Sequence, residues 1–331
     1  MQNVFEVLIC IPLVPAYRPE AHLSNYLNKG LEDMLTLDEN LEINIDGVGK
    51  FKMNVLVPED DSMIKSSFSY SYKVLVFRIL VPNDPEKTVI FRSDNSSSSL
   101  KERAELFKLH IIEEFKYQAF HLLVLSNIAY PGAIKTKEGV VLVNMKKHGS
   151  FASIYSIHRE SLGDIGILKW PTYETLTIHQ VWQWFERNNF SFQRHSNNKV
   201  ARALNAFTYL FKDGPSNLIF DLFWSLIGIE ALYCKSNEGI SEQIYEKVQL
   251  VLGPVTEHKK KIKGMYNFRS RLVHGDIDIP PNNFDYEDTD EEKFQDELYE
   301  ATILAVAVLT ATLQQIVIKN STDLRFKYIL E

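Results

Sequence analysis

The 331-residue sequence is poor in cysteine and has no excess of basic residues. Its two cysteines, Cys10 and Cys234, stand far apart and outside any C-x-x-C spacing. This argues against a zinc ribbon or a disulfide scaffold and fits a reducing cytoplasm. The formal net charge is -7, so the chain as a whole is mildly repulsive to phosphate. Any contact with nucleic acid must therefore come from a local patch of cations.

The sequence also lacks an uninterrupted apolar segment of membrane-spanning character. The longest uncharged run covers residues 301–318, and four polar residues interrupt it between Thr310 and Gln315. Such a run favours a buried helix over a membrane span. The first residues contain Glu6 and no basic leader, so they do not predict a signal peptide. We therefore expect a cytoplasmic protein without a membrane contact.

The first part of the chain, residues 1–175, predicts a mixed α/β, strand-rich domain. Short β-branched or alternating runs there end at prolines or polar turns, as strands do. They are VFEVLICIPLVP, FKMNVLVP, FSYSYKV, YKVLVFRILVP, TVIFR, GVVLVNM and ILKW. The serine tract 96–99 predicts a loop and helix cap before a long helix. That helix carries apolar residues at helical spacing, at Leu106, Leu109, Ile112, Phe115 and Ala119.

The second part, residues 176–331, predicts an all-α bundle, so the fold class is α+β. Six helices are expected, in TIHQVWQWFERN, NNKVARALNAFTYLFK, SNLIFDLFWSLIGIEALYCK, ISEQIYEKVQLVLG, VTEHKKKIKGMYNFRSRLVHG and residues 290–319. The third is apolar on nearly every face, which predicts a central position. The fourth opens with Ser241 as its expected cap. An acidic, proline-broken stretch, DIDIPPNNFDYEDTD, predicts a loop between the last two.

The fifth expected helix contains YNFRSRLVHG, residues 266–275. Gly275 follows His274 where a glycine can take the left-handed conformation that ends a helix. His274 is therefore expected in the last turn, one turn after Ser270 and on the same face. Arg269 lies about 140° around the axis from His274 and ~7.5 Å along it. Arg269 and His274 can both edge one cleft without touching each other.

This pattern suits chemistry on a phosphodiester. Arg269 would provide a permanent cation that neutralises a phosphorane-like charge, and His274 a general base or acid for a ribose 2′-hydroxyl. No metal is needed for that reaction. Spacing alone leaves a second interpretation open, because arginine and histidine five residues apart also occur in ordinary surface helices.

Glu230 gives a second indication, since it lies inside the apolar stretch LIFDLFWSLIGIEALY. A carboxylate within a bundle is costly unless it is paired. The nearest credible partners are Arg269 and Arg271. Such a pair would anchor an active-site arginine or would be purely structural.

Further basic and aromatic residues lie just before the motif. Lys259, Lys260, Lys261 and Lys263 would guide RNA by contacts to its phosphates, or would form a solvated face. Tyr266 would stack on a base beside the cleft or pack within the bundle.

Several ordered blocks of the second part resemble the HEPN domains, specifically the Apea-like branch of prokaryotic defence proteins. The resemblance covers roughly residues 176–319. The blocks are HQVWQWFERN, ARALNAFTYLF, LFWSLIGIEALY, ISEQIYEKVQLVLG and MYNFRSRLVHGD. HEPN domains carry an R-x4-6-H motif, which here reads Arg269, Ser270 and His274, and Glu230 matches an acidic position on an earlier helix.

The resemblance implies a metal-independent endoribonuclease without a cofactor, in which a dimer brings two motifs together and the 2′-hydroxyl attacks the phosphate. Arg269 and His274 would be catalytic, with Ser270, Glu230 and Arg271 in support. It also implies a role in abortive infection or toxin–antitoxin defence, with a phage-derived trigger or an antitoxin as partner.

Two alternatives differ in class from a nuclease. In the first, the bundle is a non-catalytic nucleotide-binding or dimerisation module and the N-terminal domain binds a partner, as a sensor or regulator. In the second, the N-terminal half is itself an enzyme. Because that half has no GxGxxG, P-loop, HExxH or GxSxG motif, the second alternative has little support.

Overall fold

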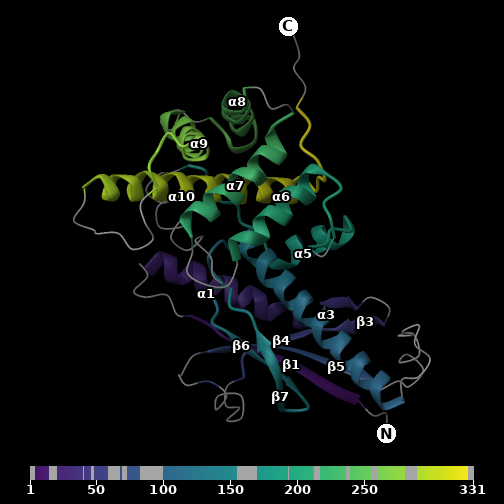
Figure 1. Cartoon of the computed structure of the whole chain (residues 1–331). Coiled ribbons are helices and arrows are strands. Elements are labelled where there is room, and N and C mark those ends of the chain that lie inside the picture. Colours follow the sequence, from purple (N-terminus) through teal and green to yellow (C-terminus); the bar gives the residue numbers. More distant parts are fainter. Residues whose placement is uncertain are drawn as a thin grey trace. The chain divides into compact units, whose positions relative to one another are not determined.

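The computed structural model describes residues 4–14, 21–39, 41–45, 48–58, 68, 73–82, 100–154, 170–192, 194–211, 217–235, 239–254, 259–279 and 289–326. By contacts the chain divides into two compact units (Figure 1). The first comprises Met1–Val124 and Ile134–Ile154, and the second Leu125–Ala133 and Tyr155–Glu331. The first unit holds an antiparallel sheet and the second a set of helices, which confirms the α+β class. The domain boundary at residues 175 and 176 remains a prediction.

The sheet of the first unit has five antiparallel strands in the order β4-β5-β1-β6-β7. Their bounds are Asn54–Leu56 for β4, Val74–Pro82 for β5, Val4–Pro12 for β1, Gly139–Val143 for β6 and Lys146–Phe151 for β7. The central strand β1 pairs with β5 and β6, so that Ile9 lies opposite both Phe77 and Val141. A central antiparallel strand has its edges paired on both sides, and β1 is accordingly buried from Val7 onward.

One face of the sheet carries a core cluster formed by Leu8, Cys10, Val74, Val76, Val140 and Leu142. A separate two-stranded sheet pairs β2, Glu42–Ile45, with β3, Gly49–Lys52. The helix α1, Ala21–Leu35, and the 3-10 helix η1, Thr36–Glu39, precede it in the chain.

The predicted strands VFEVLICIPLVP, YKVLVFRILVP and GVVLVNM are confirmed as β1, β5 and β6, while FKMNVLVP is divided between β3 and β4. The runs FSYSYKV, TVIFR and ILKW and the serine tract 96–99 fall largely or wholly outside the described residues. The elements α1, β2 and β7 were not predicted. The strand β7, KKHGSF, lies at the sheet edge, where one open side tolerates lysines and hides the apolar pattern of a strand.

The long predicted helix is α3, Leu100–Ala129, but its buried face differs from the expected one. Ile112, Phe115 and Ala119 are buried as predicted, whereas Leu106 and Leu109 are 49% and 44% exposed. The sequence of α3 contains two overlapping sets of apolar residues at helical spacing, one that includes Leu106 and Leu109 and one that includes Phe107 and Ile111. Packing selects the set that begins at Phe107 and Ile111, and helical spacing alone cannot make that choice.

All six helices predicted for the second unit are present. They are α5 Ile178–Arg187, α6 Lys199–Thr208, α7 Leu218–Tyr233, α8 Ile240–Leu252, α9 Lys259–His274 and α10 Thr289–Ile318, with the 3-10 helix η3, Tyr209–Phe211, after α6. Figure 1 shows α7 between α6 and α8, crossing α10, and these helices pack against one another. At the crossing, a Cβ on Gly228 would lie 2.9 Å from the methyl groups of Leu309, so α7 and α10 approach closely.

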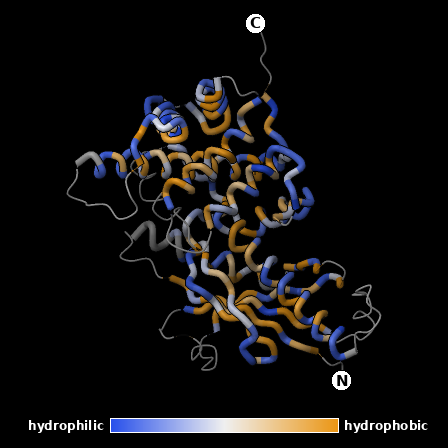
Figure 2. The backbone as a smooth tube through the Cα atoms, in the orientation of Figure 1, coloured by the Kyte–Doolittle hydropathy of each residue, from blue (hydrophilic) through white to orange (hydrophobic). Residues whose placement is uncertain are grey.

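The helix α10 forms much of the core of this unit. Its colouring in Figure 2 changes from hydrophilic at its start to mainly hydrophobic along its second half. It is long and apolar enough to cross a membrane, yet 89% of its most apolar stretch is buried, which is typical of the core helix of a soluble protein. The hydroxyls of Thr310 and Thr312 donate to the carbonyls of Val306 and Val308. These polar groups are thereby satisfied inside the bundle, and the prediction of a buried helix is confirmed.

Side-chain caps fix the starts of three helices in the second unit. Thr177 forms a capping box with Gln180 before α5, and Asn198 and Asn217 accept backbone hydrogen bonds at the starts of α6 and α7. The prediction of Ser241 as the cap of α8 is wrong. Gly239, at φ +59°, occupies the N-cap position instead, so α8 begins at Ile240 and Ser241 already lies inside its first turn.

Candidate active site

The helix α9 carries the Arg–His motif and ends where the sequence predicts. Its buried face consists of Ile262, Met265, Phe268 and Leu272. Beyond His274, Gly275 has φ +76° and the amide of Asp276 donates to the carbonyl of Arg271 at 2.8 Å. This is the Schellman arrangement, in which a left-handed residue turns the chain back over the last helical carbonyls. The predicted glycine stop is confirmed, and His274 is the last helical residue.

Arg269 of α9 pairs with Glu230 of α7. Its Nη2 lies 3.8 Å from Glu230 Oε1, and the two side chains are 24% and 23% exposed. The predicted ion pair of Glu230 is confirmed, and Arg269 is the partner. The distance is longer than a hydrogen bond, and among the described residues Glu230 Oε1 and Arg269 Nε are buried without one. The pair therefore holds Arg269 by charge and leaves donors of its guanidinium uncommitted.

Burial raises the pKa of Glu230, and the positive charge of Arg269 offsets part of that rise. Tyr266, one turn before Arg269, adds a second contact, because the guanidinium carbon lies 5.8 Å from the centre of the tyrosine ring. Burial and then the charge of Glu230 raise the pKa of the Tyr266 phenol. Glu230, Tyr266 and Arg269 thus form one partly buried cluster, in which Arg269 contacts both of the others.

His274 and Ser270 lie on another side of α9. His274 is exposed and Ser270, one turn earlier, is partly buried. Helix geometry places His274 about 140° around the axis from Arg269. Within one chain, Arg269 therefore points toward α7, whereas His274 is exposed at the C-terminal end of α9.

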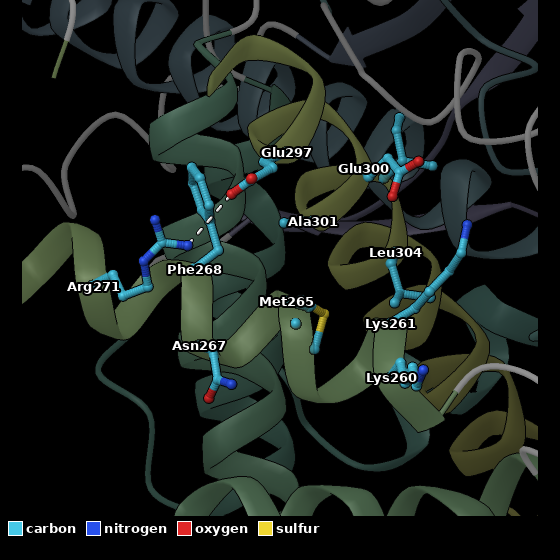
Figure 3. A pocket seen from close by; sticks show the side chains of 12 residues that line it. Lys260, Lys261, Met265, Asn267, Phe268, Arg271, Glu297, Glu300, Ala301 and Leu304 are labelled. Carbon is cyan, nitrogen blue, oxygen red and sulfur yellow. Dashed lines mark hydrogen bonds and ion pairs between the residues drawn. The ribbon is translucent and has the colours of Figure 1, made fainter. Parts of the chain in front are cut away.

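Arg271 belongs to a different surface from Arg269. Its Nη1 lies 3.4 Å from Glu297 Oε2 on α10. The two residues together line a cavity of about 620 Å³ between α9 and α10, which neither Arg269 nor His274 lines (Figure 3). Sequence reasoning grouped Arg271 with the motif because it is adjacent in the chain. A step of two residues turns it about 200° around the helix, toward α10 instead of α7.

The four lysines proposed to guide RNA divide between two sides of α9. Lys260 and Lys261 line the cavity beside α10. Lys263 lies 3.2 Å from Glu242 of α8, and the amines of Lys259 and Lys263 lie 5.1 and 5.9 Å from the centre of the Tyr245 ring. The lysine run is therefore not a single basic face.

The cavity between α9 and α10 has an apolar floor and charged edges of both signs. Met265, Phe268, Ala301 and Leu304 form apolar parts of its lining. Lys260, Lys261 and Arg271 also line it, as do Glu297 and Glu300, and Arg271 points toward Glu297 (Figure 3). Sequence patterns did not predict this cavity, because the acidic residues in the first turns of α10 have the pattern of a solvated helix start.

Sequence reasoning also missed two lysines that hold the end of α7, where Glu230 lies. Lys247 is only 2% exposed and donates to the Tyr233 carbonyl at 2.6 Å. Lys199 donates to the Cys234 carbonyl at 3.0 Å. Cations at a helix C-terminus satisfy its last carbonyls and oppose its negative dipole. Lys247 follows the apolar residue Ile244 by three residues, and this helical spacing could have predicted that Lys247 lies on the buried face of α8.

Burial lowers the pKa of Lys247. Burial and then the charge of Glu230 raise the pKa of the Cys234 thiol to about 11. A thiol with so high a pKa is protonated at neutral pH and is a poor nucleophile.

No group of three or more His, Cys, Asp or Glu side chains in the described part of the chain is placed to hold a metal ion. Comparison with known proteins adds no identification: no family model, curated protein or solved structure matches this chain.

Proposed function

We propose that the second unit is a HEPN-type bundle and that the protein is a metal-independent endoribonuclease. The observation that carries the proposal is the ion pair of Glu230 and Arg269. A largely buried carboxylate on one helix orients an arginine on another, and that arginine lies five residues before a histidine that ends its helix. This arrangement provides a positioned cation and a titratable group on one helix, the two kinds of group that phosphodiester cleavage uses.

In the proposed reaction, His274 takes the proton of a ribose 2′-hydroxyl, and the 2′-oxygen attacks the adjacent phosphorus. The bond from phosphorus to the 5′-oxygen breaks, and that oxygen leaves with a proton from a protonated group. The products are a 2′,3′-cyclic phosphate and a 5′-hydroxyl. Arg269 stabilises the charge that develops on the phosphate oxygens in the transition state.

A second copy of the chain completes this scheme. His274 is exposed and lies on another side of α9 from Arg269. One chain therefore supplies one histidine to the reaction, and this histidine acts as the base. A second His274, brought across a dimer, would protonate the leaving oxygen. The resemblance of the second unit to HEPN domains of prokaryotic defence proteins supports the further proposal of a cytoplasmic effector of anti-phage defence, which a phage-derived trigger or an antitoxin protein controls.

The test is cleavage of single-stranded RNA by the purified full-length protein in EDTA, with the trigger supplied if the protein is silent alone. Arg269→Ala and His274→Ala are expected to lose at least a hundredfold in cleavage rate while remaining folded. Arg271→Ala is the matched control, because it removes an ion pair of the same helix on the side of α10. Equal losses in Arg269→Ala and Arg271→Ala would contradict the assignment, as would full activity of His274→Ala.

One observation favours the non-catalytic alternative, a nucleotide-binding module. The cavity between α9 and α10 combines basic side chains with an apolar floor, as a nucleotide site does. The discriminating experiment is calorimetric titration of the protein with ATP, comparing wild type with Lys260→Ala. Binding that Lys260→Ala abolishes, together with full biological activity of His274→Ala, would favour this alternative over the nuclease.

A further inference from the structure

An aromatic stripe lies exposed on α7. Phe220, Trp224 and Ile227 follow one another at spacings of four and three residues, so they share one face of the helix. Phe220 is 61% exposed and Ile227 is 37% exposed. Tyr209 of η3 stacks on Trp224, with ring centres 3.7 Å apart and planes within 6°. Contiguous exposed apolar surface of this kind marks a binding surface more often than chance exposure does.

The stripe leads directly to the proposed catalytic arginine. Glu230, the partner of Arg269, follows Ile227 by one turn, and neither of these two side chains is fully buried. From Phe220 to Glu230 the axis rises ~15 Å. Aromatic rings near the start of α7 and the Arg269 guanidinium near its end therefore lie along the same helix.

Exposed arginines occur on the described segments that precede the stripe in the chain, although the chain as a whole carries a net charge of -7. Among the described residues between Arg187 and Glu230, the one carboxylate is Asp221, which is buried. Arg194 and Arg202, by contrast, are exposed.

Arg202 lies beside this surface because α6 and α7 are antiparallel. Lys199 at the start of α6 bonds the Cys234 carbonyl at the end of α7, and Tyr209 after α6 stacks on Trp224. Arg202 lies one turn after Lys199, between these two contacts along α6, and is therefore next to α7 in the antiparallel pair.

We propose that this surface binds single-stranded RNA, with unpaired bases stacked on Phe220 and Trp224 and phosphates contacted by Arg202. The inference rests on the proposed ribonuclease function and specifies how its substrate is held. Stacking accepts every base, because each has a flat π-face, and cations that flank aromatic rings are the usual composition of such surfaces. A second copy docking through the same face would bring the arginines of both copies together, which disfavours that occupant.

Tryptophan fluorescence reports on this binding independently of cleavage. Of the four tryptophans, Trp170, Trp182 and Trp184 are buried, and Trp224 is partly exposed. The probe is a 12-nucleotide 2′-O-methyl RNA, which has no free 2′-hydroxyl and cannot be cut by the proposed reaction. A second probe has the same backbone and no bases. We expect the first to quench the fluorescence saturably and the second to quench weakly, and Trp224→Phe to abolish the signal.

The affinity of the two probes is then measured by fluorescence polarisation. Wild type is expected to prefer the base-containing probe by about tenfold or more, since each stacked base contributes roughly 1–3 kcal/mol. Phe220→Ala should lose about tenfold for the base-containing probe and little for the backbone alone. Leu250→Ala, which removes another exposed apolar side chain on α8, is the matched control and should bind as wild type.

Equal affinity of wild type for the two probes would overturn the inference, as would wild-type binding by Phe220→Ala. Conversion of a dimer to a monomer by Phe220→Ala, seen by light scattering, would overturn it too and assign the stripe to contact between chains. A different result would contradict the nuclease proposal. Base-dependent quenching without any RNA cleavage would leave the stacking surface intact and reject the nuclease, whereas cleavage without base preference would reject the stacking surface alone.

Discussion

Glu230 on α7 lies 3.8 Å from Arg269 on α9, and each side chain is about three-quarters buried. The carboxylate therefore sets the position of the arginine without saturating its hydrogen-bonding groups. Lys247 and Lys199, bound to the last carbonyls of α7, hold the turn from which Glu230 projects. Arg269 is thus held by charge, and about a quarter of its side chain is exposed.

Replacing Glu230 by glutamine distinguishes a role in positioning Arg269 from a role in stabilising the fold. An ion pair of this length and exposure contributes little, so Glu230→Gln should change the free energy of unfolding by no more than about 1 kcal/mol at pH 7. The cleavage rate should fall about tenfold or more, because Arg269 loses the charge that orients it. Urea unfolding and an RNA cleavage assay on the same preparation test this. A variant that is strongly destabilised yet retains its cleavage rate would show that the pair is only structural.

Glu230 also predicts a pH dependence of stability. Burial raises the pKa of its carboxyl above the ordinary value of 4.5. Between 4.5 and the raised folded-state pKa, the unfolded chain ionises first, so the free energy of unfolding decreases as pH rises through that window. Below 4.5 the carboxyl is protonated in both states. The stability of Glu230→Gln relative to wild type should therefore increase from pH 4 to pH 7 in urea titrations. A difference that does not change with pH would contradict this.

The end of α9 can be tested with two glycines of opposite expected effect. Gly275 has φ +76° and an added Cβ would meet nothing within 4 Å, so Gly275→Ala adds backbone strain alone and should cost about 1 kcal/mol. Gly264 lies inside α9, where an added Cβ also has open space, so Gly264→Ala should stabilise by about 0.5–1 kcal/mol. Thermal unfolding measures both, and Gly275→Asn should recover part of the loss because asparagine tolerates the left-handed region.

Much of the second unit was predictable because its helices have strong apolar periodicity and clear stops. The glycine after His274 fixed the end of α9, and the apolar surroundings of Glu230 indicated a paired carboxylate. Which arginine formed the pair was not predictable, since it depends on how α9 is rotated between α7 and α10. The exposure of Phe220 was missed for a related reason. Apolar composition shows that a helix has apolar faces and does not show which of them another element covers.

The first unit was harder to predict because its edges and short strands carry little signal. The strand β2, EINI, has only four residues, and β7 begins with two lysines. In α3, the apolar positions support two stripes, and the buried one includes Phe107 instead of Leu106. These differences arise from long-range packing, which local sequence patterns do not encode.

Lys247 is predicted to be a structural support of the site. Lys247→Met preserves the approximate volume but leaves the buried carbonyl of Tyr233 without its 2.6 Å donor. We expect a loss of about 1–3 kcal/mol in the free energy of unfolding, which is the usual cost of an unsatisfied buried acceptor. Lys235→Met is the control, because Lys235 is exposed. Equal urea midpoints for the two variants would contradict a supporting role for Lys247.

His121 in the first unit predicts an acid sensitivity that is independent of the catalytic proposal. It is 4% exposed, and burial lowers the pKa of its imidazole from 6.5 to about 4. A depressed folded-state pKa contributes stability that is fully present above 6.5 and is lost as pH falls through about 4. The loss amounts to about 3 kcal/mol. Amide hydrogen exchange along α3 should show it between pH 7 and pH 4, once corrected for the intrinsic exchange rate. His121→Met should flatten that dependence and His148→Gln, at an exposed position, should leave it unchanged. Identical pH profiles for wild type and His121→Met would show that the buried neutral imidazole of His121 is not the cause of the loss of stability at low pH.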